Sequence, residues 1–164
     1  MGIRLKACVV GGGAGGKLSM DALRASSAYE LVAVADLRPE VGLELEKAYP
    51  GVKSYLDHRE MFAAHAADVV CVSTWAPSHE AVARDALALP LKGILVEKPL
   101  GHTWASGCRI LESIREKGIP MAVPHGLMAR PHSREILERV HRSEIGDLKL
   151  VEIQSARWDI INAG

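Results

Sequence analysis

A cluster of glycines near the amino terminus constrains the fold more than any other feature of this sequence. It follows residues 3–10, which we expect to be a strand, and precedes residues 17–26, which we expect to be a helix. Gly11, Gly13 and Gly16 match the pattern G-x-G-x-x-G. The first glycine of this pattern makes a tight turn, the second lets backbone approach a pyrophosphate, and the third lets the helix pack on the strand. The pattern in this context predicts a dinucleotide-binding βαβ unit.

The start of the predicted helix is the expected phosphate site. Unpaired N–H groups and the positive end of the helix dipole bind anions at such a position. A Walker-type site is excluded, because no Gly-Lys-Ser/Thr sequence follows the loop. The residues that we expect to hold the pyrophosphate are Gly11, Gly13, Ala14, Gly15 and Gly16.

An acidic residue stands where such a site needs one. Asp36 follows Gly16 by 20 residues, at the end of a second predicted strand, and this spacing is typical of the acid that binds the adenosine ribose. A carboxylate repels a 2′-phosphate, so Asp36 favours NAD, with NADP as the alternative. Arg38 stands two residues further on and has three possible roles: stacking on adenine, binding a phosphate, or facing solvent.

Short apolar runs alternate with longer helix-like stretches as far as residue 124. This alternation predicts an α/β fold, a doubly wound parallel (Rossmann) sheet with helices on both faces. We therefore assign residues 1–124 to a dinucleotide-binding domain. The further strands are expected at residues 31–35, 52–55, 67–73, 93–97 and 120–123, and the further helices at 39–48, 79–89 and 103–117.

The pattern changes after residue 124. Residues 133–141 are predicted to be a helix, and residues 148–158 alternate apolar and polar side chains, as in a strand with one solvated face. We expect residues 125–164 to be a linker helix and the first strand of an incomplete α+β domain for substrate binding or oligomerisation. A lone strand needs a partner. We therefore expect either a homo-oligomer or a missing carboxyl-terminal part.

Composition excludes several classes of protein. Of 164 residues, 20 are Lys or Arg and 20 are Asp or Glu, so no net charge attracts nucleic acid or an anionic membrane. No apolar run approaches the ~20 residues of a membrane span. Cys8, Cys71 and Cys108 form no C-x-x-C pair, so we expect neither a metal site nor a disulfide, and the two in apolar runs are predicted to be buried. A cytoplasmic location is expected.

Three further segments identify a family. They are Val-Glu-Lys-Pro-Leu at residues 96–100, T-W-A-P-S-H followed by an Ala-rich helix at 74–87, and Glu-Ile-Gly at 144–146. Together with the glycine pattern, they resemble the Gfo/Idh/MocA family of nicotinamide-dependent oxidoreductases, which act on sugars, cyclitols and related polyols. The resemblance covers nearly the whole chain.

The resemblance implies roles for the two charged residues after the fifth predicted strand. Lys98 would lie beside the nicotinamide and the substrate hydroxyl as the catalytic residue. An ammonium at the carboxyl end of a strand faces the ligand crevice of a doubly wound sheet and can take part in proton transfer. Glu97 would approach the cofactor ribose or carboxamide, or hold Lys98 in place.

The loop after the fourth predicted strand is the other expected cofactor contact. Ser73 and Thr74 would pass along the cofactor. Trp75 and Ala76 replace the proline and asparagine of the family pattern, and Trp75 could offer a flat face to the nicotinamide side. His79 corresponds to the family histidine at the start of the next helix, where the alternative to cofactor binding is a structural hydrogen bond.

Three functions are compatible with these features. The first is an oxidoreductase whose substrate domain is reduced, missing or supplied by a partner. The resemblance implies that its catalytic base would come from this second domain. The second is a nucleotide-binding module or sensor without catalysis. The third is an assembly component that pairs through its carboxyl-terminal strand.

Overall fold

The structure is a computed structural model that describes residues 3–126 and 128–152. The chain forms two compact units, Met1–Pro124 and His125–Gly164. Among the described residues, no helix is long and apolar enough to cross a membrane.

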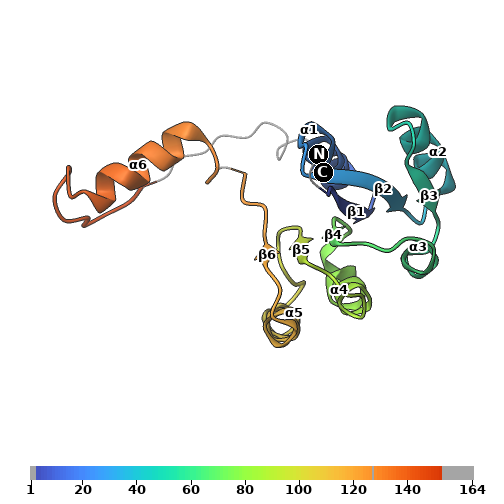
Figure 1. Ribbon diagram of the computed structural model, residues 1–164. Coiled ribbons are helices and arrows are strands. Elements are labelled where there is room, and N and C mark those ends of the chain that lie inside the picture. Colours follow the sequence, from blue (N-terminus) through green and yellow to red (C-terminus); the bar gives the residue numbers. More distant parts are fainter. Residues whose placement is uncertain (1–2, 127, 153–164) are drawn as a thin grey trace, which may run out of the picture. The chain divides into compact units, whose positions relative to one another are not determined.

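The first unit is built on one parallel sheet (Figure 1). Every pair of neighbouring strands is parallel, and the spatial order is β3-β2-β1-β4-β5-β6. The chain therefore builds one edge from β1 to β3, crosses back, and builds the other edge from β4. This order confirms the predicted doubly wound sheet. The strands are β1 (Leu5–Val10), β2 (Tyr29–Ala35), β3 (Lys53–Tyr55), β4 (Val69–Val72), β5 (Gly93–Val96) and β6 (Met121–Ala122).

Helices cover both faces of the sheet. Figure 1 shows α1 and α2 on one face and α3, α4 and α5 on the other. This division follows from right-handed crossovers, which change face when the chain reverses its direction across the sheet. The helices are α1 (Ala14–Ala25), α2 (Pro39–Ala48), α3 (His58–Ala64), α4 (His79–Leu87) and α5 (Trp104–Lys117).

A separate hydrophobic core lies on each face. In β1, Ala7 and Val9 belong to the core under α1 and α2, whereas Cys8 and Val10 belong to the core under α3, α4 and α5. Strands buried on both faces need such continuous apolar runs. Cys8 and Cys71 are buried as predicted, and burial raises the pKa of both thiols to about 12.

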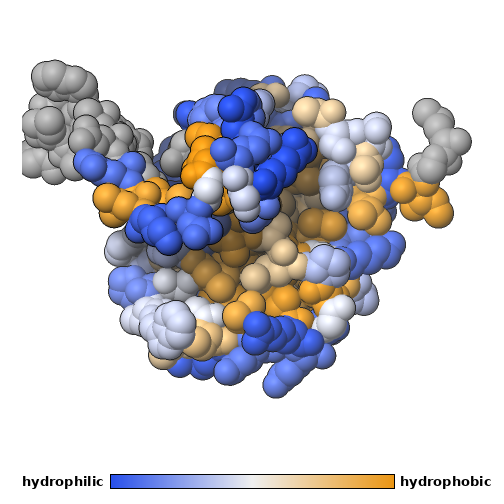
Figure 2. All heavy atoms as spheres, turned by 90° about the vertical axis from the view of Figure 1, so that its left-hand side faces the viewer, coloured by the Kyte–Doolittle hydropathy of each residue, from blue (hydrophilic) through white to orange (hydrophobic). Residues whose placement is uncertain are grey.

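An apolar cavity of about 430 Å³ lies beside β5 and β6. Helix α1 packs over β1, β2 and β4, and α2 packs over β2 and β3. Residues of α1, β5 and β6 line part of this cavity. Figure 2 shows hydrophobic residues exposed among hydrophilic ones on the face that it presents. The apolar lining includes Leu5, Tyr29, Val69, Leu95 and Met121.

The structure adds one helix that the sequence interpretation omitted. Helix α3 (His58–Ala64) lies between β3 and β4, an interval for which the sequence predicts no element. Its cap is Asp57, whose carboxylate accepts a hydrogen bond of 2.7 Å from the Arg59 amide. Met61 and Phe62 bury this helix in the core. Helix α1 also begins earlier than predicted, at Ala14, because the glycines form its first turn.

The second unit contains helix α6 (Pro131–His141), with proline in its first turn as is typical of helix starts. The strand predicted over residues 148–158 is wrong for residues 148–152, which have no strand structure. An alternating segment becomes a strand only when another strand pairs with it, and none does so within the described residues. Residues 153–158 lie outside the described part of the chain.

Packing around α2 gives a direct test of the core. Leu45 is 0% exposed and Leu43, on the same helix, is 59% exposed. We expect Leu45→Ala to lower the free energy of unfolding by about 2–5 kcal/mol, since it leaves a cavity. The matched control Leu43→Ala changes it by about 0.5 kcal/mol or less. Urea unfolding measures both, and equal losses would contradict the assigned burial.

Candidate dinucleotide-binding site

A cavity with polar and apolar walls lies at the carboxyl ends of β1, β2 and β4. This is the point where the strand order reverses, and ligands of doubly wound sheets bind there. Its volume of about 720 Å³ is within the range of small-molecule sites. Of the predicted site residues, the cavity brings together Gly11, Gly13, Asp36, Arg38, Ser73, Thr74 and Trp75.

Two glycines of the turn are required by the fold itself. Gly11 has φ +99°, and a Cβ there would lie 2.4 Å from the Ser73 carbonyl oxygen. A Cβ on Gly16 would lie 1.8 Å from the Gly11 carbonyl oxygen. Both distances are too short for any side chain. The close approach of β1, the loop after β4 and helix α1 therefore depends on these two positions.

Gly13 is different, because the protein itself leaves room there. A Cβ on Gly13 would meet no atom within 4 Å. Gly13 is also the N-cap of α1, no side chain caps the helix, and its first turn has no acidic residue. The amides of this turn, which contains Ala14, Gly15 and Gly16, lie at the positive end of the helix dipole. The space and the donors both fit a pyrophosphate.

Asp36 connects the glycine turn to the part of the cavity wall that follows β2. Its Oδ2 accepts a hydrogen bond of 2.7 Å from the Gly12 amide. The Arg38 guanidinium donates to both carboxylate oxygens, at 2.9 and 3.0 Å, and the Arg38 amide donates to Oδ1 at 3.0 Å. Burial alone would raise the pKa of Asp36, but these hydrogen bonds outweigh it and lower the pKa below its usual value. Asp36 is therefore an ionised acceptor, and Arg38 is its partner.

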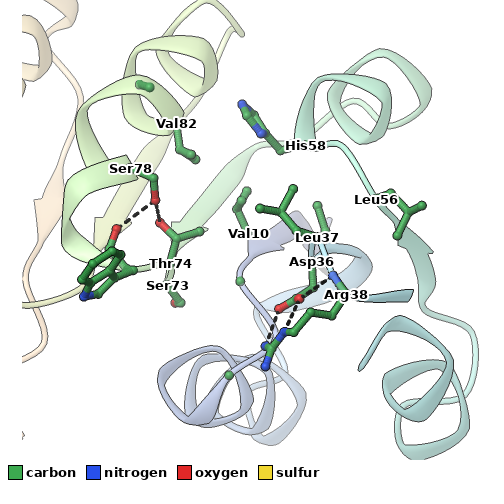
Figure 3. A pocket seen from close by; sticks show the side chains of 15 residues that line it. Val10, Asp36, Leu37, Arg38, Leu56, His58, Ser73, Thr74, Ser78 and Val82 are labelled. Carbon is green, nitrogen blue, oxygen red and sulfur yellow. Dashed lines mark hydrogen bonds and ion pairs between the residues drawn. The ribbon is translucent and has the colours of Figure 1, made fainter. Parts of the chain in front are cut away.

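The loop after β4 forms the opposite wall. Figure 3 shows Asp36 and Arg38 joined on one side of the cavity, and Thr74 and Ser78 joined on the other. The Ser78 hydroxyl donates to the Thr74 hydroxyl at 2.8 Å and is also 2.8 Å from the Trp75 carbonyl oxygen. Ser73 is buried, whereas the Trp75 side chain is 80% exposed on the cavity rim.

Glu97 and Lys98 lie after β5 and do not line this cavity. A Cβ on Gly15 would be 3.3 Å from Glu97 Oε1, so the Glu97 carboxylate lies against the first turn of α1. Its Oε2 accepts a hydrogen bond of 3.0 Å from the Lys98 amide. Lys98 is exposed, and its ammonium has no ion-pair partner within residues 3–126 and 128–152. Glu97 thus holds the backbone of Lys98, one of the two roles predicted for it.

His79 does not reach the cavity. It is 1% exposed, and its two ring nitrogens face the backbone carbonyls of Thr74, Pro99 and Leu100. This placement matches the structural alternative given for His79 rather than direct contact with a cofactor.

The apolar wall of the cavity was missed by the sequence interpretation. It includes Leu37, directly after Asp36, and Leu56, directly after β3. A large apolar residue within two positions of the end of a strand of this fold is the signal that could have indicated them. His58 also lines the cavity, and its Nε2 lies 2.9 Å from Asp85 Oδ2. Within the described residues, no group of three or more His, Cys, Asp or Glu could hold a metal ion.

The fold, the glycine turn and the acid after β2 together define a dinucleotide-binding Rossmann domain. Residues 5–125 match the model of the Gfo/Idh/MocA family, described as an oxidoreductase family with an NAD-binding Rossmann fold. The chain belongs to this family, which confirms the resemblance inferred from its motifs, and its cofactor is NAD.

Two curated relatives are inositol 2-dehydrogenases. The enzyme of Burkholderia multivorans is 39% identical over 93 residues, which cover 56% of this chain and 27% of the relative. The enzyme of Klebsiella pneumoniae is 31% identical over 147 residues, which cover 88% of this chain and 42% of the relative. The chain thus spans less than half the length of either relative.

A solved structure shows the same fold. The WlbA dehydrogenase of Chromobacterium violaceum, in complex with NADH and UDP-GlcNAcA, matches with a TM-score of 0.80 at 17% identity. The match covers 87% of this chain and 41% of that chain.

The glycine turn gives a prediction that separates binding from folding. Gly13→Ala places a methyl group in open space at an ordinary φ of −72°, so the protein should fold with nearly unchanged thermal stability. The methyl group fills the pyrophosphate space and displaces hydrogen bonds to a charged group, worth about 1.5–3 kcal/mol. NADH affinity in calorimetry should therefore fall about tenfold or more.

Gly16→Ala is the comparison. Its Cβ collides with the Gly11 carbonyl, so stability itself should fall. A Gly13→Ala variant that binds NADH as tightly as the wild type would show that the pyrophosphate lies elsewhere.

Proposed function

We propose that this chain functions as an NAD(H)-dependent dehydrogenase that acts on a sugar, cyclitol or related polyol. One observation carries the proposal: the contact between Gly15 and Glu97 places the Lys98 loop against the phosphate-binding turn. A cation at that position lies on the same edge of the sheet as the cofactor. The inositol 2-dehydrogenases among the relatives support a polyol substrate.

The chemistry assigns separate tasks to this chain. Oxidation of an alcohol moves a hydride from carbon to the cofactor and a proton from the hydroxyl to a base. Bound NAD supplies the hydride acceptor. The Lys98 ammonium donates a hydrogen bond to the substrate oxygen and stabilises its developing negative charge. Glu97 fixes the backbone from which Lys98 extends.

Turnover tests this proposal. The full chain is mixed with NAD and a panel of polyols that includes myo-inositol, and NADH absorbance is followed. Lys98→Ala should lower kcat about 10²–10⁴-fold, because it removes a group that acts on the reacting oxygen. NADH affinity should remain close to that of the wild type, since Lys98 does not line the cavity.

Lys92→Ala is the matched control. Lys92 precedes β5, and its ammonium lies 2.9 Å from Asp68 Oδ1 rather than near the glycine turn. This change should leave kcat unaltered. NADH binding without turnover of any polyol would contradict the proposal and favour the non-catalytic module. Cytoplasmic location and self-association stay predictions.

The Asp36–Arg38 pair predicts a cofactor preference. Arg38 neutralises the carboxylate that would repel a 2′-phosphate, and its guanidinium can itself bind that phosphate. Arg38→Ala should therefore lower NADPH affinity about tenfold, the size of one charged contact. NADH affinity should be unchanged or higher, because Asp36 is released to accept from the ribose.

Calorimetric titration of both cofactors measures this difference. Arg84→Ala is the control, since Arg84 is exposed on α4 and does not line the cavity. An equal loss for NADH and NADPH in the Arg38 variant would show that Arg38 does not set the preference.

A further inference from the structure

His79 occupies an unusual position at the first residue of α4. Its side chain is 1% exposed and is among the largest fully buried side chains of the molecule. Nε2 lies 2.9 Å from the carbonyl oxygen of Thr74. Nδ1 lies 3.1 Å from the carbonyl oxygen of Pro99 and 3.3 Å from that of Leu100. One rigid ring therefore spans two loops that are more than 20 residues apart in sequence.

These two loops carry the predicted chemistry. Thr74 belongs to the wall of the cavity, and Pro99 follows Lys98 directly. Strands β4 and β5 pair in parallel up to Val72 and Val96, and the Glu97 amide donates to the Val72 carbonyl at 2.8 Å. Beyond this hydrogen bond the two segments have no further strand pairing. The His79 ring forms the next connection between them.

The buried ring has no direct chemical role to offer. It does not line the cavity, and both nitrogens already lie against backbone carbonyls. Buried polar groups are normally paired, and an unpaired one is costly. A carbonyl oxygen only accepts and a neutral imidazole has one N–H, so removing the ring would leave a carbonyl of at least one loop without its donor.

We propose that His79 is a positioning residue that fixes the loop of Lys98 relative to the loop of Thr74, and so determines where the Lys98 ammonium meets substrate. This inference rests on the proposed function. His79 acts through Lys98 and contacts neither cofactor nor substrate. Small displacements of a catalytic group reduce rates strongly, by about 10²-fold for 1 Å.

Two near-isosteric variants separate the two contacts. In His79→Asn, the amide occupies the place of Nδ1 and keeps the contact with Pro99 but loses the one with Thr74. In His79→Gln, the amide reaches the place of Nε2 and keeps only Thr74. Because the connection needs both ends, each variant should lower kcat about 10- to 100-fold. NADH affinity should fall by a smaller factor than kcat, since Asp36 and the glycine turn are untouched.

A double-variant cycle distinguishes positioning from general destabilisation. In a Lys98→Ala background, His79→Asn should cause no further loss of kcat, because the group that it positions is absent. The same fold loss in both backgrounds would overturn the proposal. So would a loss of kcat that follows a matching loss of thermal stability.

Amide hydrogen exchange provides a readout that does not need turnover. Both His79 variants should speed exchange at residues 73–75 and 97–102 and leave β1 unchanged. His65→Asn is the control, because His65 contacts the Tyr55 hydroxyl at 2.9 Å, outside both loops. Unchanged exchange in the two loops would overturn the connection. An inactive wild type with the expected exchange pattern would instead contradict only the proposed function.

Discussion

The close approach of three backbone segments at Gly11 is the constraint on which the site depends. The Ser73 carbonyl lies close to the α-carbon of Gly11, and Gly16 of helix α1 lies against the Gly11 carbonyl. A methyl group at either glycine would push these segments apart. It would thereby separate the amide donors of α1 from the loop after β4. The same approach orders the turn so that Gly13 remains open. Packing thus determines where an anion can bind before any ligand is present.

Asp36 shows how a binding residue can also serve the fold. Its carboxylate accepts from the Gly12 amide, within the turn, and from Arg38. Interactions with these donors lower the pKa of Asp36, although burial opposes that shift. A ribose that binds this carboxylate therefore competes with Arg38 for the same oxygens. On the proposed function, the preference between cofactors would depend on the Asp36–Arg38 pair and not on Asp36 alone.

Much of this arrangement could be predicted from sequence, and the failures have physical causes. The glycine spacing and Asp36 are local signals, and strands buried on both faces give unmistakable apolar runs. Helix α3 was missed because seven residues give too little periodicity to detect. The strand expected at residues 148–158 was wrong where it is described, because alternation specifies a face but not a partner. The ion pair of Arg38 and the apolar wall depend on tertiary contacts that no local pattern contains.

The exposed apolar residues around the cavity fit a nucleotide ligand. Leu37, Leu56 and Trp75 are 87%, 52% and 80% exposed, and all three line the cavity. A nucleotide base has apolar faces and polar edges, so it can cover such side chains while its ribose and phosphates bind Asp36 and the start of α1. Exposed apolar surface that borders polar groups at the carboxyl ends of strands is typical of ligand sites. The first unit therefore combines residues whose arrangement fits a dinucleotide with the loop that carries Lys98.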